Sequence, residues 1–106
     1  MERIYWARNF QDGESRLQVD AECRRVQVDG RPCSLTPQEF TLLMVLLDNA
    51  NHPVQREGLL LGAWGYASLG DTRTVDVHIQ RPRKKLQLSC IETVFRVGYL
   101  IRVRED

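Results

Sequence analysis

The stretch TRTVDVHIQRPRKKLQ, residues 72–87, holds five basic side chains and one acidic side chain, Asp76. Its apolar residues fall on one stripe at the helical spacing i, i+4, i+7 and i+11: Val75, Ile79, Pro82 and Leu86. The opposite face carries basic and small residues: Arg73, Thr74, Val77, Arg81 and Lys84. The pattern therefore predicts a helix with one face in the core and a positively charged face in solvent.

Pro82 stands on the buried stripe of this helix, although proline lacks the backbone amide that would bond the carbonyl of His78. A proline in a helix interior typically costs ~3 kcal/mol. Because Ile79 and Leu86 on either side still have to reach the core, we expect the helix to continue through Pro82 with a kink.

Length and composition predict one compact domain. The chain has 106 residues, 42% of them hydrophobic, which is enough for one core and leaves no room for a second. No apolar run approaches the roughly 18 residues of a membrane span, and the start of the chain has no apolar signal segment. Its three cysteines are widely spaced without a CxxC pair, which indicates neither a disulfide framework nor a zinc site. We therefore expect a cytoplasmic domain without a metal or cofactor.

The net charge of +1 hides an uneven distribution along the chain. Residues 1–71 hold 7 basic and 10 acidic residues, whereas residues 72–106 hold 8 basic and 4 acidic residues. Such an asymmetry favours a polyanionic partner, although a basic run is more often a solvated helix face. Charge alone leaves both interpretations open.

The segments around residues 72–87 predict a sheet, two further helices and a hairpin. Residues 4–35 alternate short strands with turns, including an Asp-Gly turn, and predict a small antiparallel sheet. Thr36 is a natural N-cap, Pro37 stands at the first helical position, and Glu39 completes a capping box, so a buried helix begins there. A short helix is predicted over residues 56–64, and a hairpin in which residues 91–94 pair with residues 99–104.

Several long segments, in this order, carry a specific resemblance: LTPQEFTLLMVLL (35–47), REGLL and WGY (56–66), DTRTVDVHIQRPRKKL (71–86) and IETVFRVGYLIRV (91–103). They closely resemble the effector domain of OmpR/PhoB-type response regulators, and the likeness spans nearly the whole chain. The resemblance implies one α+β domain over residues 1–106, a winged helix-turn-helix. Its parts are a four-stranded antiparallel N-terminal sheet (1–35), three helices (36–88) and a C-terminal β-hairpin wing (91–104).

The resemblance also implies sequence-specific binding of double-stranded DNA in the control of transcription. The third helix enters the major groove and the wing reaches a minor groove. The residues that match DNA-contacting positions of the family, or stand in for them, are Arg73, Thr74, Val77, His78, Arg81, Arg83, Lys84 and Arg96. The loop that matches the family's contact with RNA polymerase consists of Trp64, Gly65, Tyr66, Ala67, Ser68, Leu69 and Gly70.

Family members carry a receiver domain upstream, which a sensor kinase controls, and no receiver is present in these residues. We therefore expect either an excised effector domain or an orphan regulator, monomeric in solution.

Two departures from the family pattern concern the DNA-facing end. Pro82 replaces a leucine of the recognition helix. The wing pattern Thr-Val-Arg-Gly-x-Gly-Tyr is TVFRVGY here, so Phe95 replaces the arginine that enters the minor groove and Arg96 replaces a turn glycine. Arg96 then occupies a position whose backbone conformation glycine adopts more easily.

Two other classes of function compete with DNA binding. An enzyme would have to use Asp76, His78 or Cys90, but Asp76 and His78 are two residues apart on a helix and diverge, and the chain has no glycine-rich phosphate loop. We therefore expect no catalytic activity. A protein-interaction module derived from a winged helix remains the alternative, because Pro82 and Phe95 both fall at the DNA-facing end.

Overall fold

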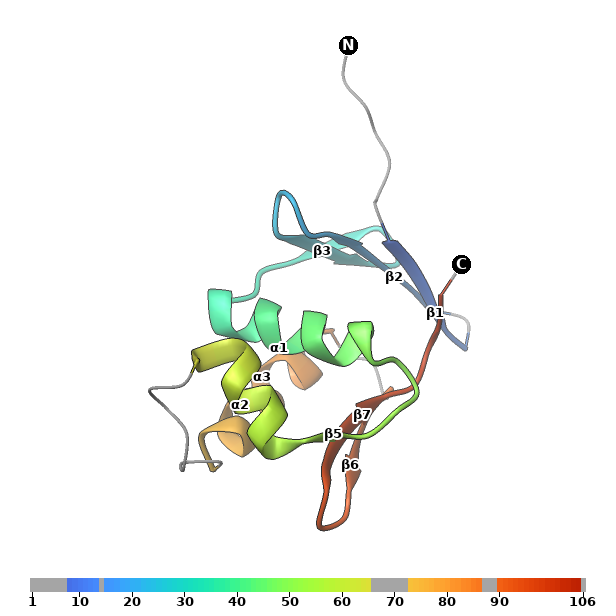
Figure 1. Cartoon of the computed structure of the whole chain (residues 1–106). Helices are drawn as coiled ribbons and strands as arrows, with labels where there is room; N and C mark the ends of the chain where they lie inside the picture. The colour runs from blue at the N-terminus through green and yellow to red at the C-terminus, as the bar shows by residue number, and fades with distance from the viewer. Residues whose placement is uncertain (1–7, 14, 66–72, 87–89, 106) are drawn as a thin grey trace.

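The computed structural model of the chain describes residues 8–13, 15–65, 73–86 and 90–105. Its strands are β1 (Arg8–Asp12), β2 (Ser15–Asp20), β3 (Arg25–Val28), β4 (Arg31–Cys33), β5 (Val54–Gln55), β6 (Ile91–Val94), β7 (Gly98–Ile101) and β8 (Arg104–Glu105). The helices are α1 (Pro37–Asp48), α2 (Arg56–Trp64) and α3 (Arg73–Leu86). Figure 1 shows α1 between the N-terminal sheet on one side and α2 and α3 on the other.

The N-terminal sheet is antiparallel with the strand order β4-β3-β2-β1-β8. The predicted Asp-Gly turn joins β3 to β4, and both of its residues have positive φ, 51° at Asp29 and 82° at Gly30. This is the backbone that a two-residue hairpin loop requires. The Asp29 carboxylate also accepts a 2.8 Å hydrogen bond from the backbone amide of Arg16. The predicted sheet is therefore confirmed among the described residues, and residues 4–7 of the predicted first strand lie outside them.

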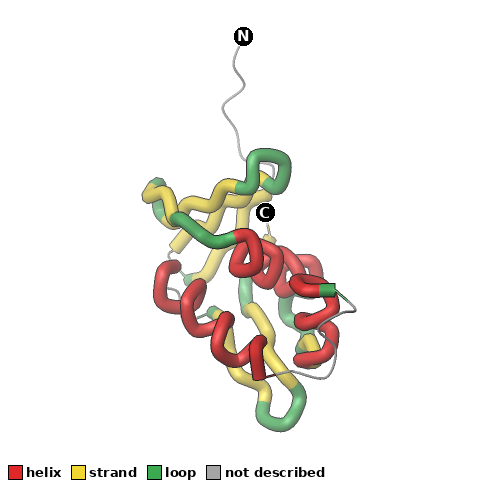
Figure 2. Tube along the Cα trace, turned by 90° about the vertical axis from the view of Figure 1, so that its left-hand side faces the viewer, coloured by secondary structure: helices red, strands yellow, loops and turns green. Residues whose placement is uncertain are grey.

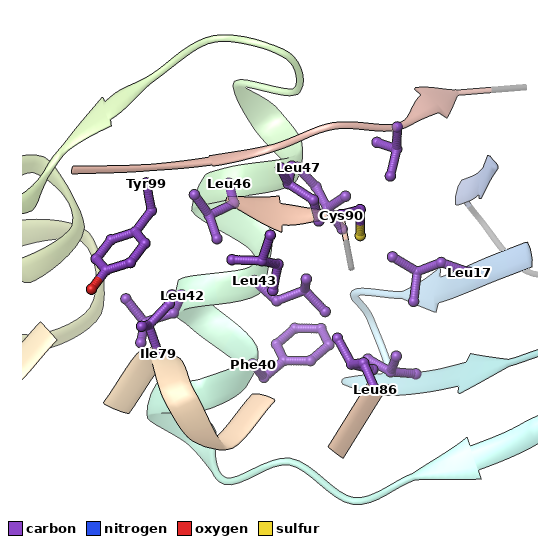
Figure 3. Packing of buried hydrophobic residues seen from close by; sticks show 14 of the residues in the cluster. Leu17, Phe40, Leu42, Leu43, Leu46, Leu47, Ile79, Leu86, Cys90 and Tyr99 are labelled. Carbon is purple, nitrogen blue, oxygen red and sulfur yellow. The ribbon is translucent and has the colours of Figure 1, made fainter. Parts of the chain in front are cut away.

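Helix α1 begins as the sequence predicts. The hydroxyl of Thr36 accepts from the amide of Glu39 at 3.2 Å, and the Glu39 carboxylate accepts from the amide of Thr36 at 2.9 Å. Apolar side chains on most of its faces are buried, so the helix passes through the centre of the core: Phe40, Leu42, Leu43, Leu46 and Leu47. In Figure 3 they lie in one cluster with Leu17 of the sheet and Ile79 of α3.

Helix α3 continues through Pro82 to Leu86. The predicted stripe is buried at all four positions: Val75, Ile79, Pro82 and Leu86. The tertiary contacts of this stripe outweigh the missing hydrogen bond, because its side chains on both sides of the proline are held in the core. The predicted continuation of the helix is confirmed.

The wing is the hairpin of β6 and β7, joined at its outer edge by the short strand β5. Gly98 of β7 lies against β5 so closely that a Cβ placed on it would stand 2.0 Å from the carbonyl oxygen of Val54. Only a glycine allows this approach of two backbones. The two residues of β5 were not predicted, because so short a strand has no periodicity to detect.

The C-terminal end of the predicted hairpin differs from the structure. β7 ends at Ile101, and β8 leaves the wing to pair with β1, where Arg104 faces Gln11. The side chain of Asn51 binds both backbone groups of Val103, accepting from its amide at 3.1 Å and donating to its carbonyl at 2.7 Å. The amide of Arg102 still bonds the carbonyl of Cys90 at 2.8 Å, and Asn51 holds the segment between β7 and β8. Arg104 is therefore part of the N-terminal sheet, where β8 joins the four predicted strands as a fifth.

Candidate nucleic-acid interface

The face of α3 that the sequence predicts to be outward is only partly buried or exposed at all five of its predicted positions. Arg73, Arg81 and Lys84 are exposed, and Thr74 is half-buried. Between them Val77 is 59% exposed. We call this set of five residues the basic face of α3. It offers guanidinium and ammonium donors together with one apolar contact.

Two other cations of the run 81–85 turn toward the protein. Lys85 Nζ lies 2.8 Å from Oε1 of Glu39, whose side chain is only 1% exposed. Arg83 donates a 3.3 Å hydrogen bond from Nη2 to the hydroxyl of Thr93 in the wing, and its guanidinium lies 5.7 Å from the ring centre of Tyr99. Arg83 and Lys85 therefore hold α3 to the wing and to α1, although the side chain of Lys85 is itself 41% exposed.

Glu39 is the buried charge beneath α3. Its burial would raise the pKa of the carboxyl group, but hydrogen bonds from Lys85 and from the amide of Thr36 together lower that pKa below its ordinary value. The carboxylate is therefore charged at neutral pH. One side chain both caps α1 and fixes the C-terminal end of α3.

Asp76 is the acidic residue of α3, and it is directed away from the basic face. Its Oδ1 atom accepts a 2.8 Å bond from Nε of Arg56 in α2 and a 2.7 Å bond from the hydroxyl of Tyr99 in β7. Burial would raise the pKa of Asp76, but the bonds from Tyr99 and Arg56 lower it on balance. The negative charge thus joins α2, α3 and the wing and does not oppose the cations outside.

His78 is held at the contact between α2 and α3. Its Nδ1 lies 3.0 Å from the carbonyl oxygen of Thr74, one turn earlier. Its ring meets the ring of Trp64 edge to face, with centres 5.0 Å apart. The residue is half-buried, so the imidazole has an internal packing role as well as a solvent-accessible part.

The predicted polymerase loop is only partly described. Trp64 ends α2 and packs against the core, and Gly65 follows with φ of 83°. The remaining residues of that prediction, 66–70, lie outside the described residues.

The wing tip carries an exposed aromatic residue. Phe95 is 80% exposed, and Val97 is 38% exposed. Arg96 between them has φ of 63°, so it adopts the left-handed conformation expected at the position of the family's glycine. Its guanidinium lies 5.2 Å from the centre of the Phe95 ring.

The three residues that an enzyme would have to use are bonded to other residues, packed against them or buried. Asp76 is bonded to Arg56 and Tyr99, and His78 packs on Trp64. Cys90 is buried, and desolvation raises the pKa of its thiol to about 12. A thiol with such a pKa is not ionised at neutral pH and is a poor nucleophile.

Three helices with a basic, solvent-facing third helix, followed by a hairpin, define the class of winged helix-turn-helix domains. Residues 30–101 match the family described as "Transcriptional regulatory protein, C terminal", and the chain belongs to this family, the OmpR/PhoB-type effector domains of response regulators. It is a family of transcriptional regulators and not of enzymes.

Known relatives agree in sequence and in fold. Response regulator ArlR of Staphylococcus saprophyticus is 43% identical over 88 residues, which cover 79% of this chain and 40% of ArlR. The RstA DNA-binding domain of Klebsiella pneumoniae, solved in complex with the RstA box, is 34% identical, with a TM-score of 0.74 over 81% of this chain and 90% of that one.

The DNA-binding domain of Bacillus subtilis CssR has a TM-score of 0.73 at 34% identity, over 80% of this chain and 98% of that one. The solved DNA-binding domains are thus matched over most of their length, whereas the chain spans about 40% of the length of its curated relatives.

The part of the chain that the structure describes holds no helix long and apolar enough to cross a membrane.

Proposed function

We propose that the chain is the output domain of a two-component response regulator, which controls transcription by binding double-stranded DNA at a specific sequence. The observation that carries the proposal is the basic face of α3: Arg73, Arg81 and Lys84 are exposed around Val77, while Asp76 is bonded inward. Membership of the effector-domain family supports it.

The proposed mechanism assigns a chemical role to each part of this face. With α3 in the major groove, an arginine such as Arg73 or Arg81 bonds the O6 and N7 acceptors of guanine, and Val77 contacts a thymine methyl group. Thr74 and Lys84 bind the edges of bases or the backbone. Phosphate contacts fix the position of the helix and base contacts supply the sequence preference.

His78, Arg83 and Arg96 complete the proposed contacts at the phosphate backbone. His78 and Arg83 also make internal contacts, to Thr74 and Thr93 respectively. Their substitution is therefore expected to change folding stability together with DNA binding, which makes them poor single tests of the interface.

Further partners follow from the family and are proposed on that basis. The segment Trp64–Gly70 is proposed to contact RNA polymerase. A receiver domain under the control of a sensor kinase is proposed to regulate the chain, which acts in the cytoplasm. The 106-residue domain itself is proposed to be a single, monomeric unit; a dimer mass in light scattering at all concentrations would contradict this.

The test is an anisotropy titration against duplexes that the parent chain selects from a random library, repeated at several salt concentrations. Binding is expected to weaken steeply with salt, as phosphate contacts release counterions. Arg73→Ala is expected to weaken specific binding by about 1–3 kcal/mol with little change in folding stability. Arg31→Ala, which removes the same charge from an exposed position of β4 in the N-terminal sheet, is the control.

Two results would decide against the proposal. Equal effects of the two substitutions would show that only overall charge matters and would remove α3 as the reading element. Absence of duplex binding even at low salt would support the alternative, a protein-interaction module that has lost DNA binding.

A further inference from the structure

The wing tip presents Phe95 to solvent without a packing reason for it. Few large apolar side chains among the described residues have more than a third of their surface exposed. Phe95, at 80%, is the most exposed of these. The wing is held by its other end, where Tyr99 and Ile101 are buried in the core cluster. The Phe95 ring is therefore not needed for the fold of the wing and is available for an external contact.

The turn fixes how the ring is presented. The amide of Val97 donates a 3.0 Å bond to the carbonyl of Val94, which closes the turn. Arg96 adopts positive φ within it, and its guanidinium lies 5.2 Å from the Phe95 ring centre, a cation–π distance. The tip thus combines one aromatic ring with one cation, and TVFRV contains no acidic residue.

The tip points to the same side of the molecule as the start of the basic face. Both views place it opposite the N-terminal sheet and on the side of the N-terminal end of α3, where Arg73 lies (Figures 1 and 2). Two contacts keep the wing in this relation to α3: Arg83 bonds Thr93, and Tyr99 bonds Asp76. A duplex along α3 is therefore within reach of the tip.

We propose that Phe95 is an apolar wedge that enters the minor groove of the bound duplex and partly unstacks one base step, while Arg96 binds the adjacent phosphate. This inference rests on the proposed function. Apolar side chains, phenylalanine among them, serve as such wedges in proteins that bind the minor groove. Pyrimidine–purine steps unstack most easily, so the wing would select a flexible step beside the sequence read by α3.

The charge of the tip favours DNA over a second copy of the chain. Two wings meeting through their Phe95 rings would bring two Arg96 guanidinium groups together, and like charges repel. A polyanion accepts both parts of the tip, because phosphates attract the cation and bases offer flat surfaces for the ring.

The experiment compares Phe95→Ala with Leu61→Ala, which removes an exposed apolar side chain of α2 that is 37% exposed. The probe is the duplex selected by the parent chain, with 2-aminopurine placed in turn at each adenine flanking the α3 site. The parent is expected to raise the fluorescence at one step by unstacking it. Phe95→Ala is expected to lose this signal and to weaken binding at least about fivefold. Leu61→Ala should retain both.

Salt dependence separates the ring from the cation. Phe95→Ala removes no charge, so its salt slope is expected to equal that of the parent, whereas Arg96→Ala flattens the slope by about one unit. Phe95→Arg, which restores the family's residue, is expected to bind tightly with a steeper slope but without the fluorescence signal.

The inference is overturned if Phe95→Ala binds within about twofold of the parent, or if the fluorescence change survives the substitution. It is also overturned if the parent self-associates through Phe95 while duplex affinity does not depend on this residue. Failure of the parent to bind any duplex at low salt is a different result, since it removes the proposed function itself.

Discussion

The hydroxyl of Tyr99 in the wing donates a 2.7 Å hydrogen bond to Oδ1 of Asp76 in α3. The same oxygen accepts from Arg56 at 2.8 Å, and the Arg56 guanidinium lies 5.4 Å from the Tyr99 ring centre. The two elements proposed to contact DNA are thus joined through one carboxylate. This bond therefore helps to fix the position of the wing relative to α3.

Tyr99→Phe is expected to loosen this connection while it preserves the ring. Loss of one hydrogen bond to a charged group should lower the free energy of unfolding by about 1–2 kcal/mol. Duplex binding should weaken without a change in salt slope, because no cation is removed. Denaturant unfolding and anisotropy titrations measure the two effects.

A double-mutant cycle of Tyr99→Phe with Asp76→Ala, which removes the acceptor oxygen, checks the cause of the Tyr99 effect. If the two substitutions add without a coupling energy, the bond does not connect the wing to α3 and the loss arises elsewhere.

The free energy of unfolding is expected to fall as the solution becomes acidic. Burial opposes ionisation of Glu39, but Lys85 and Thr36 hold its pKa below the ordinary value of 4.5. Because the folded pKa lies below the unfolded one, this stabilisation is complete above about pH 4.5 and is lost as the pH falls through the folded value. Asp76 acts in the same direction from its ordinary value of 3.8.

Urea unfolding of the parent and of Glu39→Gln at a series of pH values between about 7 and 3 measures this dependence. The glutamine retains an acceptor for Thr36 but cannot titrate, so the variant should be less stable at neutral pH and should lose less stability on acidification. Equal pH slopes for the two proteins would show that Glu39 does not contribute.

Substitutions of the adjacent lysines 84 and 85 are expected to change different properties: Lys85 contributes to folding stability and Lys84 to duplex binding. Lys85→Ala leaves the buried Glu39 carboxylate without its 2.8 Å partner, so the free energy of unfolding should fall by about 1–3 kcal/mol. Lys84→Ala removes an exposed side chain and should change stability by less than about 0.5 kcal/mol. In duplex titrations Lys84→Ala should flatten the salt slope by about one unit, and Lys85→Ala should leave it unchanged.

The two lysines serve as controls for each other, since they carry the same charge on the same turn. Similar salt slopes for both variants would show that the ion pair with Glu39 does not keep Lys85 from contacting DNA.

The sequence predicts the parts of this fold that local pattern determines. The capping box of Thr36 and Glu39, the bounds of α2 and the buried stripe of α3 all follow from the spacing of side chains within one element. Periodicity also places Lys84 on the outward face and leaves Lys85 off it, but it does not identify the partner of Lys85. That partner is Glu39, which lies 46 residues away in the chain.

The features that sequence reasoning missed are contacts between distant segments. Beyond Ile101, Asn51 binds the backbone of Val103 and Arg104 pairs with Gln11, and no local signal reports a bond across 52 residues. The sequence likewise shows Asp76 only as one acidic residue on a basic helix. Its bonds to Arg56 and Tyr99 become known only from the structure. Long-range polar contacts of this kind have no period in the sequence.

The last prediction concerns Pro82, which is buried on the inner stripe of α3 while the helix continues to Leu86. The proline removes the amide that would bond the carbonyl of His78, and its ring fills less of the core than a leucine. Pro82→Leu is therefore expected to stabilise the domain by about 1–3 kcal/mol, through one backbone hydrogen bond and additional apolar contact. The effect on duplex binding should be smaller than that of Arg73→Ala, because Arg73 lies upstream on helix that the proline does not interrupt. Thermal melts and titrations of the two variants measure both quantities. If Pro82→Leu melts below the parent, the core around this position fits the proline ring and the leucine overpacks it.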